Sequence, residues 1–428
     1  NSSQSVMITN AGFKAVAINP STPVTFPGSM TVSNLTISGP TNGGNLLLLN
    51  FFGTTTPLHV LNDLNIGANG NLSMLFSGLK VDGQLNVNGT FGQEGGELTF
   101  TNSATNTMQI EGGTFNLTNG VVTGKNLYLG GTTNGTAIQA SGVVWVDWFV
   151  LGLKSFDFNA GGGNYTLQNG WLMVNSYEGI GFHGLGTFIQ RGGTNSAPLL
   201  FVGPGNYLKN GGAVFAGELG IVVSGSSLTH AGGSTTISNL LHFDAGGPGA
   251  AFNMLGGSVS TPRIEMTSGG LFTQSNGTVN VSGELFMEVN HQSSSPNSYH
   301  LNGGNLFSAK TTISFEDSSF IQSGGTHMVT NTLWINSGTS VYQFTGGTLN
   351  APNIALTGNI SQPPQFIILG APFYTITNQT INLTGGVIVI QDSAQQFGSL
   401  SMQIDSGINL AGSTAILRFA DSHTNDWA

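Results

Sequence analysis

The sequence predicts an all-β protein, a single elongated parallel β-helix (β-solenoid) with coils of about 22 residues. Three observations predict this fold. A six-residue phrase recurs along the chain, short segments alternate between apolar and polar residues, and helix signals are nearly absent. The repeats do not fix the hand of the coil, and we expect a right-handed one.

The recurring phrase begins with an aromatic or aliphatic residue and ends in Gly-Gly or Asn-Gly. Its two most similar copies are FIQRGG (188–193) and FIQSGG (320–325). The copies between residues 165 and 347 are YTLQNG, FIQRGG, YLKNGG, LTHAGG, FNMLGG, FTQSNG, YHLNGG, FIQSGG and YQFTGG, and their first residues lie 19 to 27 residues apart. Each copy therefore marks one coil, and the mean step is about 22 residues.

Each position of the phrase has a structural interpretation. The first and third residues lie two apart on a strand, so they face the same side, and this side is the core because both are apolar in alternate copies. In the copies between, the third residue is Gln or His, and we expect an inward Gln that bonds to the backbone of the turn. The glycines turn the chain where a positive φ is needed or where a side chain would collide with the neighbouring coil. The structural repeat residues of the two most similar copies are Phe188, Gln190, Gly192, Gly193, Phe320, Gln322, Gly324 and Gly325.

Period-two alternation predicts short strands throughout the chain, for example in residues 84–91, 332–336, 386–391 and 400–405. A β-propeller is the alternative, because its four-stranded blades of about 40–45 residues match two steps of the repeat. We favour the solenoid because both halves of the double step carry the same phrase, whereas the strands of a blade play different roles.

The regularity of the repeat divides the chain into three segments. Residues 1–84 form divergent N-terminal coils, residues 85–390 a regular repeat array, and residues 391–428 the C-terminal coil or end segment. Only 7% of the residues are charged and 39% are hydrophobic, which excludes a charge-rich disordered chain. The surface is therefore expected to consist of Asn, Ser, Thr and Gly.

Charge and composition also limit the partners and the location. Nine Lys and Arg against nineteen Asp and Glu give a net charge of -10 without a basic stripe, so we expect no nucleic-acid partner. The apolar runs 46–52 and 143–153 are too short for a membrane helix, so we expect no membrane span. Cysteine is absent and the eight His are scattered, so we expect no cofactor and no metal site. The lack of Cys, together with the polar uncharged surface, favours an extracellular location.

The alternation of F-x-Q-S-G-G-T with Y-x-L-x-G-G-x-L resembles the repeats of secreted bacterial β-solenoids. These include the autotransporter-associated β-strand repeat proteins and passenger-like proteins. The stretch STAILRFADSHTNDWA (413–428) is similar to the closing stretch of some of them, and the repeat resemblance covers residues 85–390. The resemblance implies a surface fibre, stalk or adhesin, and it transfers no catalytic residue to this chain.

A polysaccharide lyase or hydrolase on a β-helix is the alternative of the enzyme class, and it requires acidic side chains that converge on one face. Glu284 and Glu288 are four residues apart on one expected strand face, near His291. We expect the acids to be solvated surface groups and the protein not to be an enzyme. The acidic candidates are Asp147, Asp157, Glu178, Glu265, Glu284, Glu288 and Asp317.

Residues 143–171 are rich in aromatic side chains, and Trp145, Trp148 and Trp171 are the candidates for a glycan or subunit contact. Strict alternation places Trp145 and Trp148 on opposite faces of one strand, so one of the two is expected to be exposed. We expect these side chains to fill the core or to form a subunit contact. An exposed platform for sugar stacking, as in a carbohydrate-binding surface module, is the alternative.

Strand-like alternation continues almost to both ends of the chain, in residues 5–19 and 408–423. Neither stretch has the polar or charged character of a solenoid cap. Because an unpaired strand edge pairs with any matching strand, we predict a homo-oligomer in which subunits stack end to end into filaments. The expected function is that of an extracellular structural protein.

Overall fold

A computed structural model describes residues 4–25, 30–50, 58–101, 106–152, 161–181, 184–244, 249–288, 295–314, 317–336, 338–359, 361–370, 379–403 and 406–419. The chain forms two compact units, an N-terminal unit (Asn1–Ala216) and a C-terminal unit (Gly217–Ala428). The three segments expected from the sequence concern the regularity of the repeat, and that division stays a prediction.

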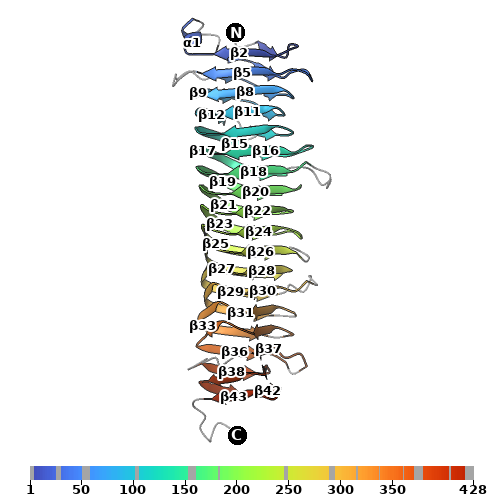
Figure 1. Cartoon of the computed structure of the whole chain (residues 1–428), viewed down its shortest axis with the longest axis vertical. Helices are drawn as coiled ribbons and strands as arrows, with labels where there is room; N and C mark the ends of the chain where they lie inside the picture. The colour runs from blue at the N-terminus through green and yellow to red at the C-terminus, as the bar shows by residue number, and fades with distance from the viewer. Residues whose placement is uncertain are drawn as a thin grey trace. The chain divides into compact units, whose positions relative to one another are not determined.

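The expected fold class is confirmed, because the chain is an all-β parallel solenoid with about 22 residues per turn. In each unit the strands of successive coils lie side by side and form two parallel sheets, sheet A and sheet B (Figure 1). Parallel pairing excludes the propeller, whose blades are antiparallel meanders. Within the described residues the one α-helix is α1 (Ser21–Thr25). The right hand of the coil stays a prediction.

In the N-terminal unit sheet A contains two short strands per coil at first, and these merge into one long strand from β15 onward. Its strands are β1 (Ser5–Ile8), β3 (Thr31–Val32), β4 (Asn34–Ile37), β6 (Leu58–Val60), β7 (Leu64–Ile66), β9 (Ser77–Val81), β10 (Leu85–Val87), β12 (Gly96–Phe100), β13 (Thr107–Ile110), β15 (Val121–Leu129), β17 (Val143–Leu151), β19 (Trp171–Ile180) and β21 (Thr194–Val202). Sheet B consists of β2 (Lys14–Ile18), β5 (Asn45–Asn50), β8 (Gly70–Leu75), β11 (Thr90–Gln93), β14 (Thr114–Leu117), β16 (Gly135–Gln139), β18 (Gly163–Leu167), β20 (Gly186–Gln190) and β22 (Gly205–Lys209). The boundary between the units falls within β23 (Ala213–Ile221).

The C-terminal unit repeats this arrangement. Its sheet A contains β25 (Ser234–Asp244), β27 (Ser258–Ser268), β29 (Thr278–Glu288), β31 (Asn305–Ser314), β33 (Thr326–Asn336), β35 (Thr348–Asn350), β36 (Asn353–Thr357), β38 (Thr380–Thr384) and β41 (Ser399–Met402). Its sheet B contains β24 (Ser227–His230), β26 (Ala250–Met254), β28 (Gly270–Gln274), β30 (Ser298–Leu301), β32 (Ser319–Gln322), β34 (Val341–Phe344), β37 (Gln365–Leu369), β39 (Val387–Gln391) and β42 (Gly407–Ala411). A separate pair is formed by β40 (Ala394–Phe397) and β43 (Ile416–Phe419).

The copies of the phrase stack directly on one another in sheet B. Phe188 is the register partner of Tyr207, and Tyr299 is the partner of Phe320. These first residues are buried, and the rings of Tyr299 and Phe320 stack with centroids 4.9 Å apart and planes within 2°. Because the spacing of paired strands, about 4.8 Å, suits the stacking of aromatic rings, one aromatic residue per coil fills the core.

The buried Gln at the third position of the phrase ties two coils together. Gln322 Nε2 donates to Gly325 O in its own corner (3.3 Å) and to Thr348 O in the next coil (2.9 Å). Gln190 makes the equivalent bonds to Gly193 O (3.3 Å) and to Ala213 O (2.9 Å). The same pattern is repeated by Gln93, Gln139 and Gln274. The corner carbonyls also accept a backbone N–H of the next coil, as Gly325 O does from Thr348 N at 2.8 Å, so the amides provide their second hydrogen bond.

The alternation of the phrase has a physical cause. The Tyr of the following coil donates its hydroxyl proton to the Gln Oε1, as Tyr299 does to Gln274 at 2.6 Å. The equivalent bonds join Tyr165 to Gln139, Tyr207 to Gln190, and Tyr342 to Gln322. Gln93 is the exception, because the next coil carries Phe115, and its Oε1 is buried without a hydrogen-bond partner. A Gln coil is thus followed by a Tyr coil so that both ends of the amide are bonded.

The two glycines of the phrase have different tasks. Gly325 adopts φ 65° and Gly193 adopts φ 67°, in the left-handed region that residues with a Cβ avoid. The glycine before each has an ordinary φ but no room for a side chain. A Cβ on Gly324 would lie 2.3 Å from Asn302 O of the preceding coil, and one on Gly192 would lie 2.5 Å from Gln168 O.

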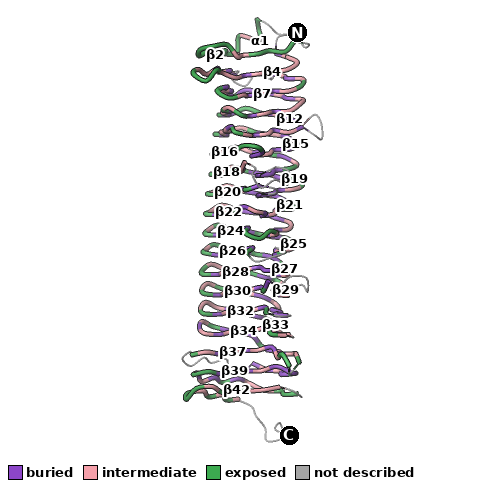
Figure 2. The backbone as a smooth tube through the Cα atoms, turned by 90° about the vertical axis from the view of Figure 1, so that its right-hand side faces the viewer, coloured by how far each residue is buried: buried purple, intermediate pink, exposed green. Residues whose placement is uncertain are grey.

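The first coil of the N-terminal unit is open. Within the described residues β1 pairs with β4 and β2 pairs with β5, so the other edge of each strand is unpaired. Val16 faces inward but is 41% exposed, whereas its partner Leu47 is 2% exposed. Figure 2 shows that β2 is largely exposed. Helix α1 follows β2 and leaves this edge uncovered at Val16.

The last described coil of the C-terminal unit has the same property. Leu410 of β42 is 51% exposed, whereas its register partner Ile390 is fully buried. Met402 of β41 is 42% exposed beside the buried Leu383. Both terminal coils therefore present core-type side chains and strand edges without a partner among the described residues.

Candidate functional site

The three candidate Trp side chains lie on the outside of the N-terminal unit. Trp145 is 46% exposed, Trp148 43% and Trp171 51%. The expectation that they fill the core is therefore wrong, and the alternative of a subunit contact stays a prediction. Both Trp145 and Trp148 are exposed, where strict alternation predicted one. The side chains of β17 stop alternating between the two sides of the sheet at Asp147, so that Trp145 and Trp148 both point outward. Opposite Asp147 the neighbouring strand β19 carries a β-bulge formed by Asn175 and Ser176.

Trp145 is held in place by a polar network. Its Nε1 donates to Asn175 Oδ1 at 2.8 Å, and Asn175 Nδ2 donates to Asp147 Oδ1 at 2.9 Å. Lys125 Nζ lies 2.9 Å from Asp147 Oδ2. The hydrogen bonds from Asn175 and Lys125 hold the pKa of Asp147 below its ordinary value, so the carboxylate is charged and neutralised by Lys125.

The other aromatic side chains extend this surface across neighbouring coils. The Trp148 and Tyr177 rings are 5.2 Å apart, and the Tyr177 and Phe201 rings are stacked at 5.7 Å. Burial raises the pKa of Tyr177 to about 12, so its hydroxyl is neutral. Trp171 of β19 is the diagonal neighbour of Trp145 of β17, within reach of a large side chain. Together, Trp145, Trp148, Trp171, Tyr177 and Phe201 are called the aromatic face below.

Two of the acidic candidates, Glu265 of β27 and Glu284 of β29, are outward diagonal neighbours on adjacent strands, and each is paired with a cation. Glu284 lies 3.0 Å from Lys310 Nζ, and Glu265 lies 3.5 Å from Arg263 Nε. Glu288 is four residues beyond Glu284 on the same strand, which separates their backbones by about 13 Å. Catalytic carboxylates of glycosidases are about 5–9.5 Å apart.

The remaining acidic candidates are also apart from one another. Asp317 is exposed in a turn, where its Oδ1 accepts a hydrogen bond from Thr339 Oγ1 at 2.6 Å. Asp157 and His291 lie outside the described residues.

Glu178 contradicts the expectation of a surface acid, because it is fully buried. Its Oε1 accepts a hydrogen bond from Asn195 Nδ2 at 2.9 Å, while Glu178 Oε2 and Asn195 Oδ1 have no hydrogen-bond partner among the described residues. Burial raises the pKa of Glu178 to about 8, so the group is a neutral carboxylic acid at neutral pH. Glu178 lies an even number of residues after the buried Leu172 and Val174, and this spacing in the sequence predicts an inward side chain.

Sequence reasoning also missed two buried basic side chains. Lys209 occupies the third position of its phrase, in register with Gln190, and is 1% exposed. Its Nζ donates to Gly212 O at 3.0 Å, which imitates the Gln amides, and burial lowers its pKa to about 8. His327 is fully buried, and burial lowers its pKa to about 3.

His327 belongs to a directed chain of hydrogen bonds in the core of the C-terminal unit. Tyr342 donates to Gln322 Oε1, so its oxygen accepts from His327 Nδ1 at 3.0 Å. His327 Nε2 then accepts from Thr311 Oγ1 at 3.1 Å, and Thr311 accepts from Ser308 at 2.9 Å. Burial keeps the imidazole neutral, and with Nδ1 as the donor this neutral form satisfies every hydrogen bond of the chain.

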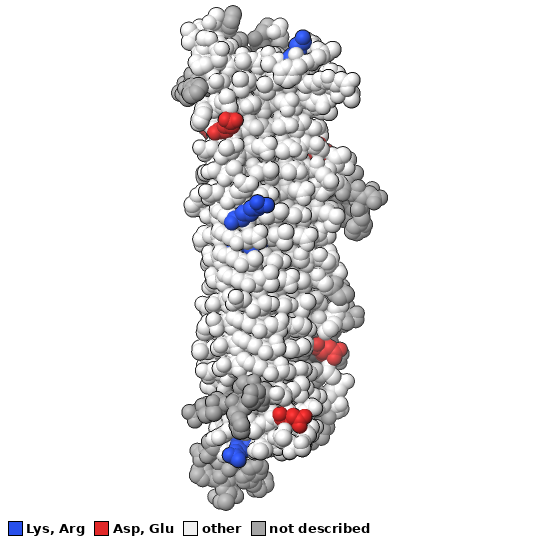
Figure 3. All heavy atoms as spheres, viewed as in Figure 1, with Lys and Arg blue, Asp and Glu red and all other residues white. Residues whose placement is uncertain are grey.

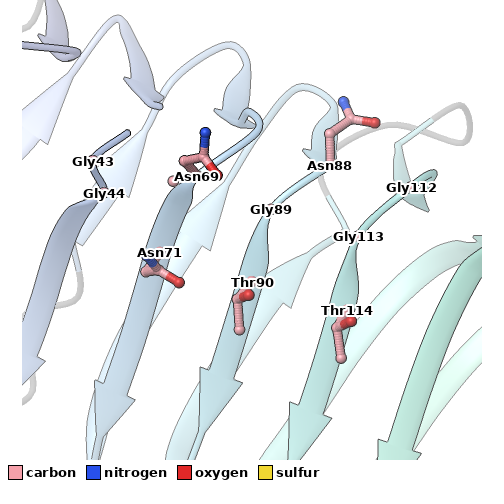
Figure 4. A pocket seen from close by; sticks show the side chains of 11 residues that line it. Gly43, Gly44, Asn69, Asn71, Asn88, Gly89, Thr90, Gly112, Gly113 and Thr114 are labelled. Carbon is pink, nitrogen blue, oxygen red and sulfur yellow. The ribbon is translucent and has the colours of Figure 1, made fainter. Parts of the chain in front are cut away.

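A second surface feature is an open groove of about 360 Å³ in the N-terminal unit. It follows the corners of four coils, and Asn71, Thr90 and Thr114 form one outward row along it (Figure 4). Its lining consists of Gly, Asn and Thr, without an aromatic or charged side chain. The aromatic face is the stronger candidate, because it combines large apolar surface with oriented polar groups.

In the described part of the chain, no three His, Cys, Asp or Glu side chains are grouped so that they could hold a metal ion. No helix there has the length and apolar character needed to cross a membrane.

Comparison with known proteins gave no match to a protein-family model, to a curated protein or to a solved structure. The structure shows the β-solenoid repeat fold that the resemblance implies, and membership of the secreted bacterial β-solenoids stays a prediction.

Proposed function

We propose that this protein is a non-catalytic structural component that assembles end to end into extracellular filaments and serves as a fibre, stalk or adhesin. The open terminal coils carry this proposal. Each presents unpaired strand edges beside inward-facing apolar side chains, such as Val16 and Leu410, that are exposed although their partners in the next coil are buried.

The ends have the properties that favour strand addition. A further coil placed on either end would continue both sheets and would bury apolar side chains, each worth about 1.5–3 kcal/mol when fully buried. In proteins that stay monomeric, exposed sheet edges usually carry charged residues or Pro. In β2 the only charged residue is Lys14, and β42 contains none.

The surface composition supports an extracellular location. Charged side chains are sparse on the face shown in Figure 3, and the strands carry Asn, Ser and Thr on their outer sides. Cysteine is absent from the sequence. This composition fits a protein that works outside the cell, where we place it.

The assembly is tested by light scattering with size-exclusion chromatography and by negative-stain electron microscopy over a range of protein concentrations. We expect concentration-dependent filaments from the unaltered chain. Val16→Lys and Leu410→Lys place a charge at the inward side of the two ends and should abolish the filaments. The matched controls Ala17→Lys and Asn409→Lys alter the adjacent outward positions and should leave them intact. The proposal is overturned if the unaltered chain stays monomeric at high concentration.

The enzyme alternative is less well supported, because its acidic candidates are paired with cations, buried or placed in a separate turn. Glu265 and Glu284 each pair with a cation, Glu178 is in the core, and Asp317 lies in a separate turn. Release of reducing or unsaturated sugars from a polysaccharide panel, lost in Glu284→Gln, would reverse this choice.

A further inference from the structure

We propose that the aromatic face of the N-terminal unit binds an uncharged polysaccharide. This inference is independent of end-to-end assembly, because the residues concerned lie on the outer side of β17, β19 and β21 and not at a terminal coil.

The rings of the aromatic face are available to a ligand. Two outward aromatic side chains of the C-terminal unit, by contrast, are covered by cations. Lys310 Nζ lies 4.7 Å from the centroid of the Trp334 ring, and Arg263 lies 5.1 Å from that of Phe286. Within the described residues, no Lys or Arg lies over the ring of Trp145, Trp148 or Trp171. The N-terminal unit therefore presents open indole rings, whereas the indole ring of Trp334 in the C-terminal unit is covered by Lys310.

The rings of the aromatic face are also rigidly placed. Trp145 is fixed by its hydrogen bond to Asn175, and Trp148 packs against Tyr177, which in turn packs against Phe201. All of them project from strands of a parallel sheet. A preorganised aromatic surface loses little conformational entropy when a ligand binds.

The groups on the aromatic face match the chemistry of a sugar. The faces of sugar rings carry C–H groups that stack on indole rings, and their edges carry hydroxyls. Asp147, Asn175 and Lys125 lie between the aromatic groups with further lone pairs and N–H groups directed to solvent. The single carboxylate is neutralised by Lys125 at 2.9 Å, so the surface has no net charge to attract an anionic polymer. An uncharged polysaccharide fits both the apolar rings and this balanced polar network.

The experiment is affinity electrophoresis in native gels that contain a neutral β-glucan, a neutral mannan or the anionic polygalacturonate. We expect retardation by at least one neutral polymer and a weaker effect of polygalacturonate. Trp145→Ala and Trp148→Ala should each weaken binding roughly tenfold, as expected for the loss of an aromatic anchor. Asn175→Ala, which releases Trp145, should weaken it less.

The control is Trp334→Ala, which removes a Trp whose ring is covered by Lys310 and should leave the retardation unchanged. Circular dichroism checks that every variant keeps the β-fold. The proposal is overturned if neither neutral polymer retards the protein or if polygalacturonate retards it most. It is also overturned if Trp148→Ala changes the oligomeric state and not the binding of sugar, because the face would then be a contact between copies of the chain.

Discussion

The hydrogen bond between Tyr and Gln in successive coils can be tested by removing it at one place and adding it at another. Tyr299→Phe deletes a hydroxyl that donates to Gln274 Oε1 at 2.6 Å in a fully buried site. The stacked rings of Phe272 at 4.6 Å and Phe320 at 4.9 Å remain, so the change is confined to one hydrogen bond. Leaving a buried acceptor without a partner costs about 1–3 kcal/mol of unfolding free energy.

The reverse substitution is Phe115→Tyr. Phe115 occupies the position of Tyr299 in its own coil, and Gln93 Oε1 of the preceding coil is buried without a partner. A new hydroxyl there should stabilise the protein by up to about 1 kcal/mol, provided that the ring keeps its place against Phe91 at 5.1 Å.

Urea unfolding followed by circular dichroism measures both effects, with the midpoint compared at constant m. The control is Tyr128→Phe, which alters a half-buried Tyr on the outer side of β15. A loss for Tyr299→Phe no larger than that for Tyr128→Phe refutes the role of the bond. Destabilisation by both Tyr299→Phe and Phe115→Tyr would show that packing of the ring, and not the hydroxyl, decides the alternation.

Three further predictions concern the core and the corners. The pKa of Glu178 is raised to about 8 in the folded state, against 4.5 in the unfolded chain, so stability should fall as pH rises between these values, by about 1.4 kcal/mol per pH unit at most. Glu178→Gln should flatten this dependence in urea titrations from pH 5 to 9, and an unchanged slope would contradict it. The pKa of His327 is lowered to about 3 from 6.5, so stability should fall as pH decreases through that window, with the same maximal slope. His327→Gln should shift acid unfolding to lower pH, and no shift would show that other groups control it. Gly325→Ala should destabilise by more than about 1 kcal/mol, because the position has φ 65° and a Cβ would lie 2.6 Å from Gly304 O, whereas Gly92→Ala, which faces open space, should be nearly neutral. Equal thermal midpoints of these two glycine variants would refute the argument.

The sequence by itself determined the coil. One phrase per turn and a side-chain period of two place Phe188 and Phe320 in the core, Gln190 and Gln322 beneath the corner, and glycines at the turn. These properties are local and are repeated in every coil, so each copy supports the same interpretation.

Only the tertiary structure decided what differs from coil to coil. Strand β17 runs through the positions that two separate short strands, β12 and β13, occupy in an earlier coil, and its side chains change facing at Asp147, where these two positions meet. For this reason Trp145 and Trp148 are both exposed although strict alternation separates them. The bond from Tyr299 to Gln274 joins residues 25 apart in the sequence. Such contacts depend on which residues the stacking of coils brings together, and no period within a single coil contains that information.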